Sequence, residues 1–183
     1  MPNRTDVPRY APSESFPPYS YVSGMHPHPV RDPQGHSYGC HTKPMHLKAE
    51  DGVDWNRFRY AIDLFNHGYY WEAHEAWEEL WHAAGRCGAW ADLLKGYIHL
   101  AAAGVKMREG RGNGVRRHAL RTCELIAQSR QANAAENVWQ QMIELNELEQ
   151  FARSVSRMEP SPDDTTVQTV KVVFAQPLRL LSP

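Results

Sequence analysis

The chain has 183 residues, a formal net charge of −1 and three cysteines. This length suits one domain, and a near-neutral charge gives no overall attraction to nucleic acid or to a membrane surface. Three cysteines without a CxxC pair exclude a disulfide framework and a zinc ribbon, and no apolar run approaches the roughly 20 residues that a bilayer requires. The first residues lack the apolar core of a secretory signal, so we expect a soluble cytoplasmic protein.

The N-terminal quarter differs in composition from the rest. Nine of the thirteen prolines precede residue 45 and none lies between residues 45 and 159, whereas all six tryptophans lie inside that proline-free block. Proline removes backbone donors, and a segment with few aliphatic side chains cannot offset its ordering entropy. We therefore predict that residues 1–48 form a disordered, Pro/His-rich tail that contributes little stability. Its five histidines match the spacing of no structural zinc site.

Helical periodicity continues from Asp54, which can cap a first helix, to about residue 158. The pattern predicts a helical domain over residues 49–159 and a C-terminal tail over residues 160–183, where Pro160 and Pro162 stop the last helix. Valine and threonine at 165–174 indicate a packed tail or an edge strand. The fold class is all-α, a compact bundle of about five helices with a disordered N-terminal tail. The expected helices are residues 54–66, 69–84, 89–108, a fourth after Gly114, and 134–158.

Residues 65–81 combine ionisable and bulky aromatic side chains on the second predicted helix. His74 and Glu78 are four residues apart, so they share one face and can bind a common ion. We predict a site for a small polar ligand formed by His74, Glu75 and Glu78, with Trp81 as its apolar wall, and a divalent metal held by His74 and Glu78. We expect both of these side chains to be substantially buried. The alternative is a border histidine beside a solvated face of glutamates.

Two known metal motifs do not fit this segment. A zincin requires His-Glu-x-x-His, but residue 78 is glutamate; a ferritin-like di-iron site requires two Glu-x-x-His pairs, and only Glu79 with His82 provides one. His99 on the third predicted helix could complete a cluster with His74 and Glu78 if its polar strip faces the second helix. If the protein is an enzyme, Glu78 or His74 would be the general base.

Basic residues dominate residues 106–121, where Glu109 is the one acidic residue. This run suits either an anion beside the glycine-rich turn or a solvated face that balances the acidic second helix. It contains no P-loop motif and lacks aromatic residues for base stacking, so we predict no specific nucleic-acid binding. The sequence is also compatible with a homo-oligomer.

The 65–81 segment resembles the bacterial and archaeal family called domain of unknown function 309 (DUF309). A second similarity, an apolar helix followed by a basic glycine turn, extends the resemblance over roughly residues 54–130. It implies a small all-helical fold but no established activity. Lys95 and His99 depart from the family, whose members often have glutamine in this helix. The matching residues of the first motif are Phe65, Asn66, Gly68, Tyr70, Trp71, Glu72, Ala73, His74, Glu75, Glu78, Glu79 and Trp81.

Two classes of function follow. The first is an uncharacterised helical domain that binds a small polar ligand or a divalent metal between helices. The second is a non-catalytic protein-interaction module, in which the His/Glu motif is a closed polar network that fixes helix packing. The sequence identifies no catalytic residue and no cofactor beyond this metal.

Overall fold

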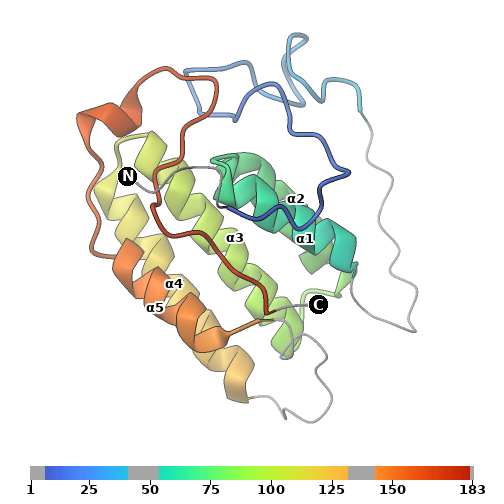
Figure 1. Cartoon of the computed structure of the whole chain (residues 1–183), viewed down its shortest axis with the longest axis vertical. Coiled ribbons are helices and arrows are strands. Elements are labelled where there is room, and N and C mark those ends of the chain that lie inside the picture. The colour runs from blue at the N-terminus through green and yellow to red at the C-terminus, as the bar shows by residue number, and fades with distance from the viewer. Residues whose placement is uncertain (1–6, 41–53, 132–142, 182–183) are drawn as a thin grey trace.

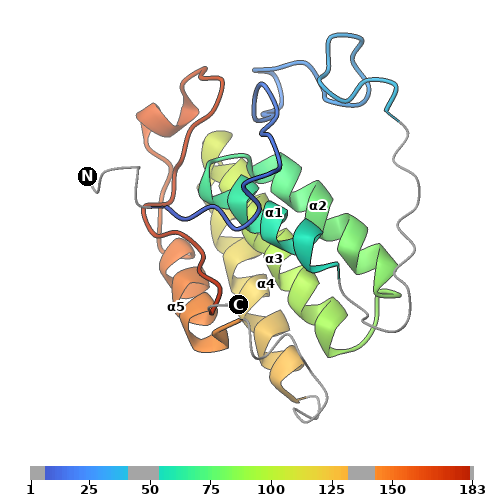
Figure 2. The ribbon, with the colours of Figure 1, turned by 45° about the vertical axis from the view of Figure 1, so that its right-hand side comes forward.

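The computed structural model describes residues 7–40, 54–131 and 143–181. Within these ranges the protein is all-α, which confirms the predicted bundle of five helices (Figures 1 and 2). No helix among them combines the length and the apolar character that spanning a membrane requires. The elements are α1 (Trp55–Asn66), α2 (Tyr70–Ala83), α3 (Ala89–Arg108), α4 (Gly112–Gln131), α5 (Leu145–Val155) and a 3₁₀ turn, η4 (Pro162–Thr165).

Local signals explain how α1 and α2 form a hairpin. The carboxylate of Asp54 accepts a hydrogen bond from the backbone N–H of Arg57 at 2.9 Å and so caps α1. Gly68 has a φ of 90°, a left-handed conformation that lets the chain reverse before α2. These are the boundaries that the sequence predicts.

Helix α3 is the centre of the bundle, packed against α2 on one side and α4 on the other (Figure 1). The side chains of Trp77 on α2 and Tyr97 on α3 are almost fully buried, with ring centroids 4.9 Å apart. Gly104 lets α3 approach α2 closely, because a Cβ atom there would lie 2.5 Å from the ring of Tyr70. A glycine at this position therefore brings α2 and α3 into close contact.

Three predicted boundaries are wrong. The fourth helix begins at Gly112, within the glycine-rich turn, and not after Gly114. The fifth helix begins at Leu145, where the carboxylate of Glu144 accepts from the backbone N–H of Asn146, and it ends at Val155. Most of the predicted first half of that helix, residues 134–142, lies outside the described residues.

The described part of the N-terminal segment, residues 7–40, has no helix or strand, in agreement with its composition. The sequence did not indicate its contacts with the bundle. Asp63 on α1 is completely buried, and its carboxylate accepts from the backbone N–H groups of Tyr10 and Ala11, both at 2.8 Å, and from Arg9 Nε at 3.0 Å. This segment therefore supplies the partners of a buried charge.

A second buried carboxylate holds the same segment against α2. Glu72 is 7% exposed and accepts from the backbone N–H of Tyr21 at 2.8 Å and from the hydroxyl of Ser20 at 3.2 Å. The Nε2 atom of His36 lies 3.3 Å from the same carboxylate. The alternative interpretation, in which the motif's glutamates form a solvated face, is therefore wrong for Glu72.

The C-terminal segment is the packed tail that the sequence predicts as one of two outcomes. Residues 166–181 have no strand, but Phe174 and Leu178 are buried. The side-chain amide of Asn66 donates to the carbonyl of Leu178 at 2.9 Å and accepts from its N–H at 2.7 Å. This pairing satisfies a buried amide at the end of α1.

Candidate functional site

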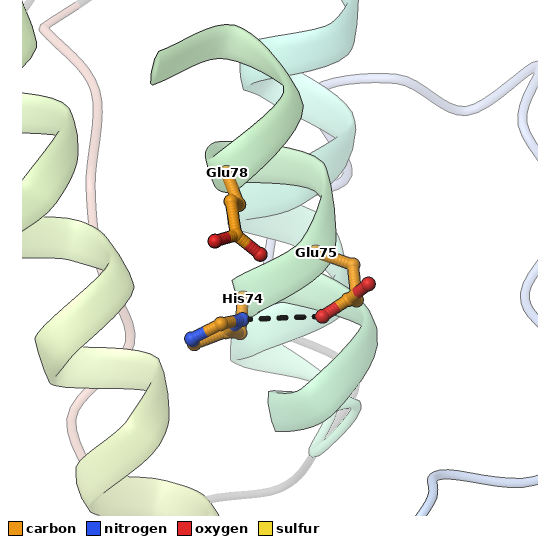
Figure 3. A group of neighbouring side chains, drawn as sticks. All are labelled: His74, Glu75 and Glu78. Atoms are coloured by element: carbon orange, nitrogen blue, oxygen red, sulfur yellow. Dashed lines mark ion pairs between the residues drawn. The ribbon is translucent and has the colours of Figure 1, made fainter. Parts of the chain in front are cut away.

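Helix α2 brings three potential ligand groups together. His74, Glu75 and Glu78 each offer an atom, and these atoms lie within 4.8 Å of one another. In Figure 3 the imidazole of His74 and the carboxylate of Glu78 extend from the same side of α2, and the carboxylate of Glu75 approaches the imidazole. The distance from His74 Nδ1 to Glu75 Oε1 is 3.4 Å. The predicted common reach of His74 and Glu78 is confirmed.

The predicted burial of His74 and Glu78 is wrong for Glu78 and holds in part for His74. The side chains of His74, Glu75 and Glu78 are 28%, 41% and 41% exposed. The ring nitrogen Nδ1 of His74 is nevertheless buried, and it makes no hydrogen bond to the described residues. The carboxylate of Glu75 is close enough for an ion pair but does not align with this nitrogen. The group is thus open to solvent on its carboxylate side.

No lysine or arginine among the described residues neutralises the carboxylates of Glu75 and Glu78. Among the described residues, the ion-pair partner of Glu78 is His82, whose Nε2 lies 4.0 Å away. The adjacent Glu79 is different, because Arg57 on α1 donates to it at 2.7 Å and 3.0 Å. Two carboxylates that converge on an imidazole without a counter-charge repel one another, and a bound cation would relieve that repulsion.

Trp81 lies one turn beyond the cluster and is partly buried. Lys95 Nζ of α3 is 5.3 Å from the centroid of its ring, and the guanidinium of Arg86 is 5.6 Å away. Both are cation–π distances. The indole ring of Trp81 can therefore serve as the apolar wall of the site, although the side chains of Arg86 and Lys95 already lie near it.

His99 lies against α4 and does not belong to the group formed by His74, Glu75 and Glu78. Its Nδ1 is 2.9 Å from Nδ1 of His118, so one imidazole donates and the other accepts. Burial, followed by the neighbouring His118, lowers the pKa of His99 from 6.5 to about 4. Burial and then Arg117 lower the pKa of His118. The charge of His74 has a smaller effect in the same direction on both pKa values, as expected for a pair near the cluster. Because both pKa values are lowered, the two imidazoles are neutral at pH 7.

This pair predicts an acid-sensitive element of stability. Above pH 6.5 His99 is neutral in both the folded and the unfolded states. Between pH 6.5 and about 4 the imidazole is protonated in the unfolded chain but stays neutral in the folded chain. The stability that His99 confers is therefore lost as the pH falls through this window. His99→Gln should lose less stability between pH 7 and pH 5 than the parent in urea titrations. The exposed His82→Gln is the control, and equal losses in the parent and His99→Gln would contradict the assignment.

Local glutamates neutralise part of the basic run, and not the acidic second helix as the sequence suggested. Lys106 Nζ lies 2.7 Å from Glu109, and Arg121 pairs with Glu124 at 2.6 Å. Arg116 and Arg117 are exposed.

A small cavity lies elsewhere, between α5 and the C-terminal tail, and is lined by residues including Leu148, Phe151 and Leu178.

These features define a small all-α domain that presents a histidine–carboxylate group on its second helix. Residues 58–118 match the family described as "Domain of unknown function (DUF309)", which confirms the resemblance seen in the sequence. The match includes α2 and α3 with the whole His/Glu motif. No curated protein and no solved structure matches the chain.

Proposed function

We propose that this domain binds a divalent transition-metal ion through His74, Glu75 and Glu78. The observation that supports the proposal is the convergence of three ligand atoms within 4.8 Å of one another, without a lysine or arginine partner among the described residues. Imidazole nitrogen together with carboxylate oxygen is a ligand set that Zn²⁺ and related ions accept.

Three protein ligands leave coordination positions for water or for a small polar ligand, as in catalytic zinc sites. The partial exposure of Glu75 and Glu78 gives such a ligand access. Trp81 would form the apolar wall, and the neutral His99 on α3 would offer a hydrogen-bonding group nearby.

The competing interaction module, with a closed structural network, fits one glutamate of the motif. Glu72 is buried and ties the N-terminal segment to α2. His74, Glu75 and Glu78 differ from it because their side chains reach solvent and make few polar contacts. We therefore divide the motif into a structural residue, Glu72, and a metal-binding group.

We also propose a cytoplasmic location, where Cys40, Cys87 and Cys123 would stay as free thiols.

Calorimetric titration of tag-free protein with Zn²⁺ tests this function. We expect one strong equivalent in the parent, and at least about tenfold weaker binding in His74→Ala and in Glu78→Gln, because each removes a direct ligand. Glu79→Gln is the matched control, since Glu79 is on the same helix but pairs with Arg57. The histidines of residues 1–48 are present in every variant. Unchanged Zn²⁺ affinity in His74→Ala would reject the site.

A further inference from the structure

Arg108, at the end of α3, is a buried cation that no carboxylate of the described residues contacts directly; Asp164 attracts it from beyond ion-pair distance. It is 3% exposed, and no carboxylate of the described residues lies within ion-pair distance. Its Nη2 donates to the carbonyl of Thr166 at 3.1 Å and contacts Met25 Sδ at 3.9 Å, whereas its Nε, also buried, makes no hydrogen bond to the described residues.

A second buried nitrogen without a partner lies in the same region. Nδ1 of His26 is inaccessible to solvent and makes no hydrogen bond to the described residues. The ring stacks on Tyr19, with centroids 5.2 Å apart, and the backbone N–H of His26 donates to the carbonyl of Val22 at 3.3 Å. The neighbouring residue, Met25, contacts Arg108 Nη2 through its Sδ at 3.9 Å, which brings the start of this loop to the guanidinium. Burial and then the charge of Arg108 lower the pKa of His26, and the carboxylate of Glu72 opposes them.

The position of His26 is built into the fold. Glu72 on α2 anchors this loop through the backbone N–H of Tyr21, and the backbone N–H of Ser20 donates to the carbonyl of Thr169 at 2.9 Å. Three segments therefore meet here: the N-terminal segment, the end of α3 and the C-terminal tail. A loop held from two sides gives His26 a fixed place beside Arg108.

A buried guanidinium whose counter-charge is not in direct contact is costly, and so is a buried donor that lacks an acceptor. The carbonyl end of α3 offsets part of the charge of Arg108 but leaves its Nε unsatisfied. A small anion would satisfy both needs, since one oxyanion can accept from Arg Nε–H and from an imidazole N–H together. Arginine binds carboxylate and phosphate oxygens through this planar N–H geometry.

We propose that Arg108 and His26 hold a small oxyanion beneath the N-terminal segment. This site is separate from the metal-binding group and involves other residues. Arg108 lies inside the stretch that matches the family and His26 lies outside it, so the site combines a matched helix with a segment beyond the match. The oxyanion would be an inorganic phosphate or a carboxylate, which share the required acceptor oxygens.

The test is the thermal midpoint of the full chain in the presence of a chelator and at constant ionic strength. Adding 10 mM phosphate or 10 mM acetate, in separate arms, should raise the midpoint of the parent by about 3 °C for an anion present at roughly ten times its Kd. A rise with phosphate alone identifies a tetrahedral oxyanion, and a rise with acetate identifies a carboxylate. No rise with either anion, or an equal rise with chloride, would overturn the proposal.

Single substitutions test which residues bind the anion. Arg108→Gln and His26→Gln should each weaken binding at least tenfold, and Arg116→Gln, which changes an exposed arginine on α4, should leave it unchanged. Arg108 is buried, so its variant could fail to fold; His26 is in an irregular segment, and His26→Gln then decides the question. Parent-like anion binding by a folded His26→Gln variant would refute the site.

Discussion

Replacing Asp63 by alanine should lower the free energy of unfolding by about 3 kcal/mol. The side chain of Asp63 is completely buried and accepts from Arg9, Tyr10 and Ala11. Removing one partner of a buried charged network leaves the other groups unsatisfied, and such losses reach about 3–5 kcal/mol. Urea titration monitored by circular dichroism measures the change. The size of the effect separates an integral N-terminal segment from the loosely attached tail that its composition suggests.

Two controls sharpen this test. Asp163→Ala removes a carboxylate that is 79% exposed and paired with Lys171, and it should change stability by less than about 0.5 kcal/mol. Asp63→Asn keeps one acceptor oxygen and should lie between the two. An Asp63→Ala variant as stable as Asp163→Ala would show that the contacts of residues 9–11 contribute nothing to the fold.

Replacing Gly104 by alanine should lower the free energy of unfolding by about 2 kcal/mol. The added Cβ would meet atoms of the Tyr70 ring at 2.5 Å. That ring is 1% exposed and packs against Phe65 and Phe174, with centroids 5.2 Å and 5.3 Å away, so it has little room to move. The strain of overpacking should exceed the helix-propensity gain of about 1 kcal/mol.

Gly96→Ala is the matched control, because it makes the same chemical change in the same helix. Its Cβ would lie 3.8 Å from Leu125 and from the backbone of Thr122, which is ordinary contact. It should be neutral or stabilising by up to about 1 kcal/mol. Equal stabilities for the two variants would mean that α2 and α3 are not in close contact at Gly104.

Short-range signals in the sequence explain why most of the bundle was predictable. Asp54 caps α1, and Gly68 and Gly85 adopt positive φ values after α1 and α2. Each of these signals acts within a few residues. The start of α5 was missed because apolar spacing continues upstream of Leu145, whereas the cap at Glu144 fixes where the helix begins.

The candidate site was predictable where it depends on a single helix. His74, Glu75 and Glu78 are brought together by the geometry of α2 alone. The pairing of His99 with His118 depends on how α3 packs against α4, and the role of Glu72 depends on partners more than thirty residues upstream. Spacing within one helix contains no information about either contact, so both required the structure.

The central claim is that His74, Glu75 and Glu78 bind one metal ion, and anomalous diffraction from crystals grown with Zn²⁺ tests it most directly. We predict a peak at the zinc edge within about 2.0–2.2 Å of a ring nitrogen of His74 and of a carboxylate oxygen of Glu78, the usual zinc–ligand distances. The peak should be absent from crystals of His74→Ala grown under the same conditions. A parent crystal that binds zinc at other residues but not at this group would contradict the account.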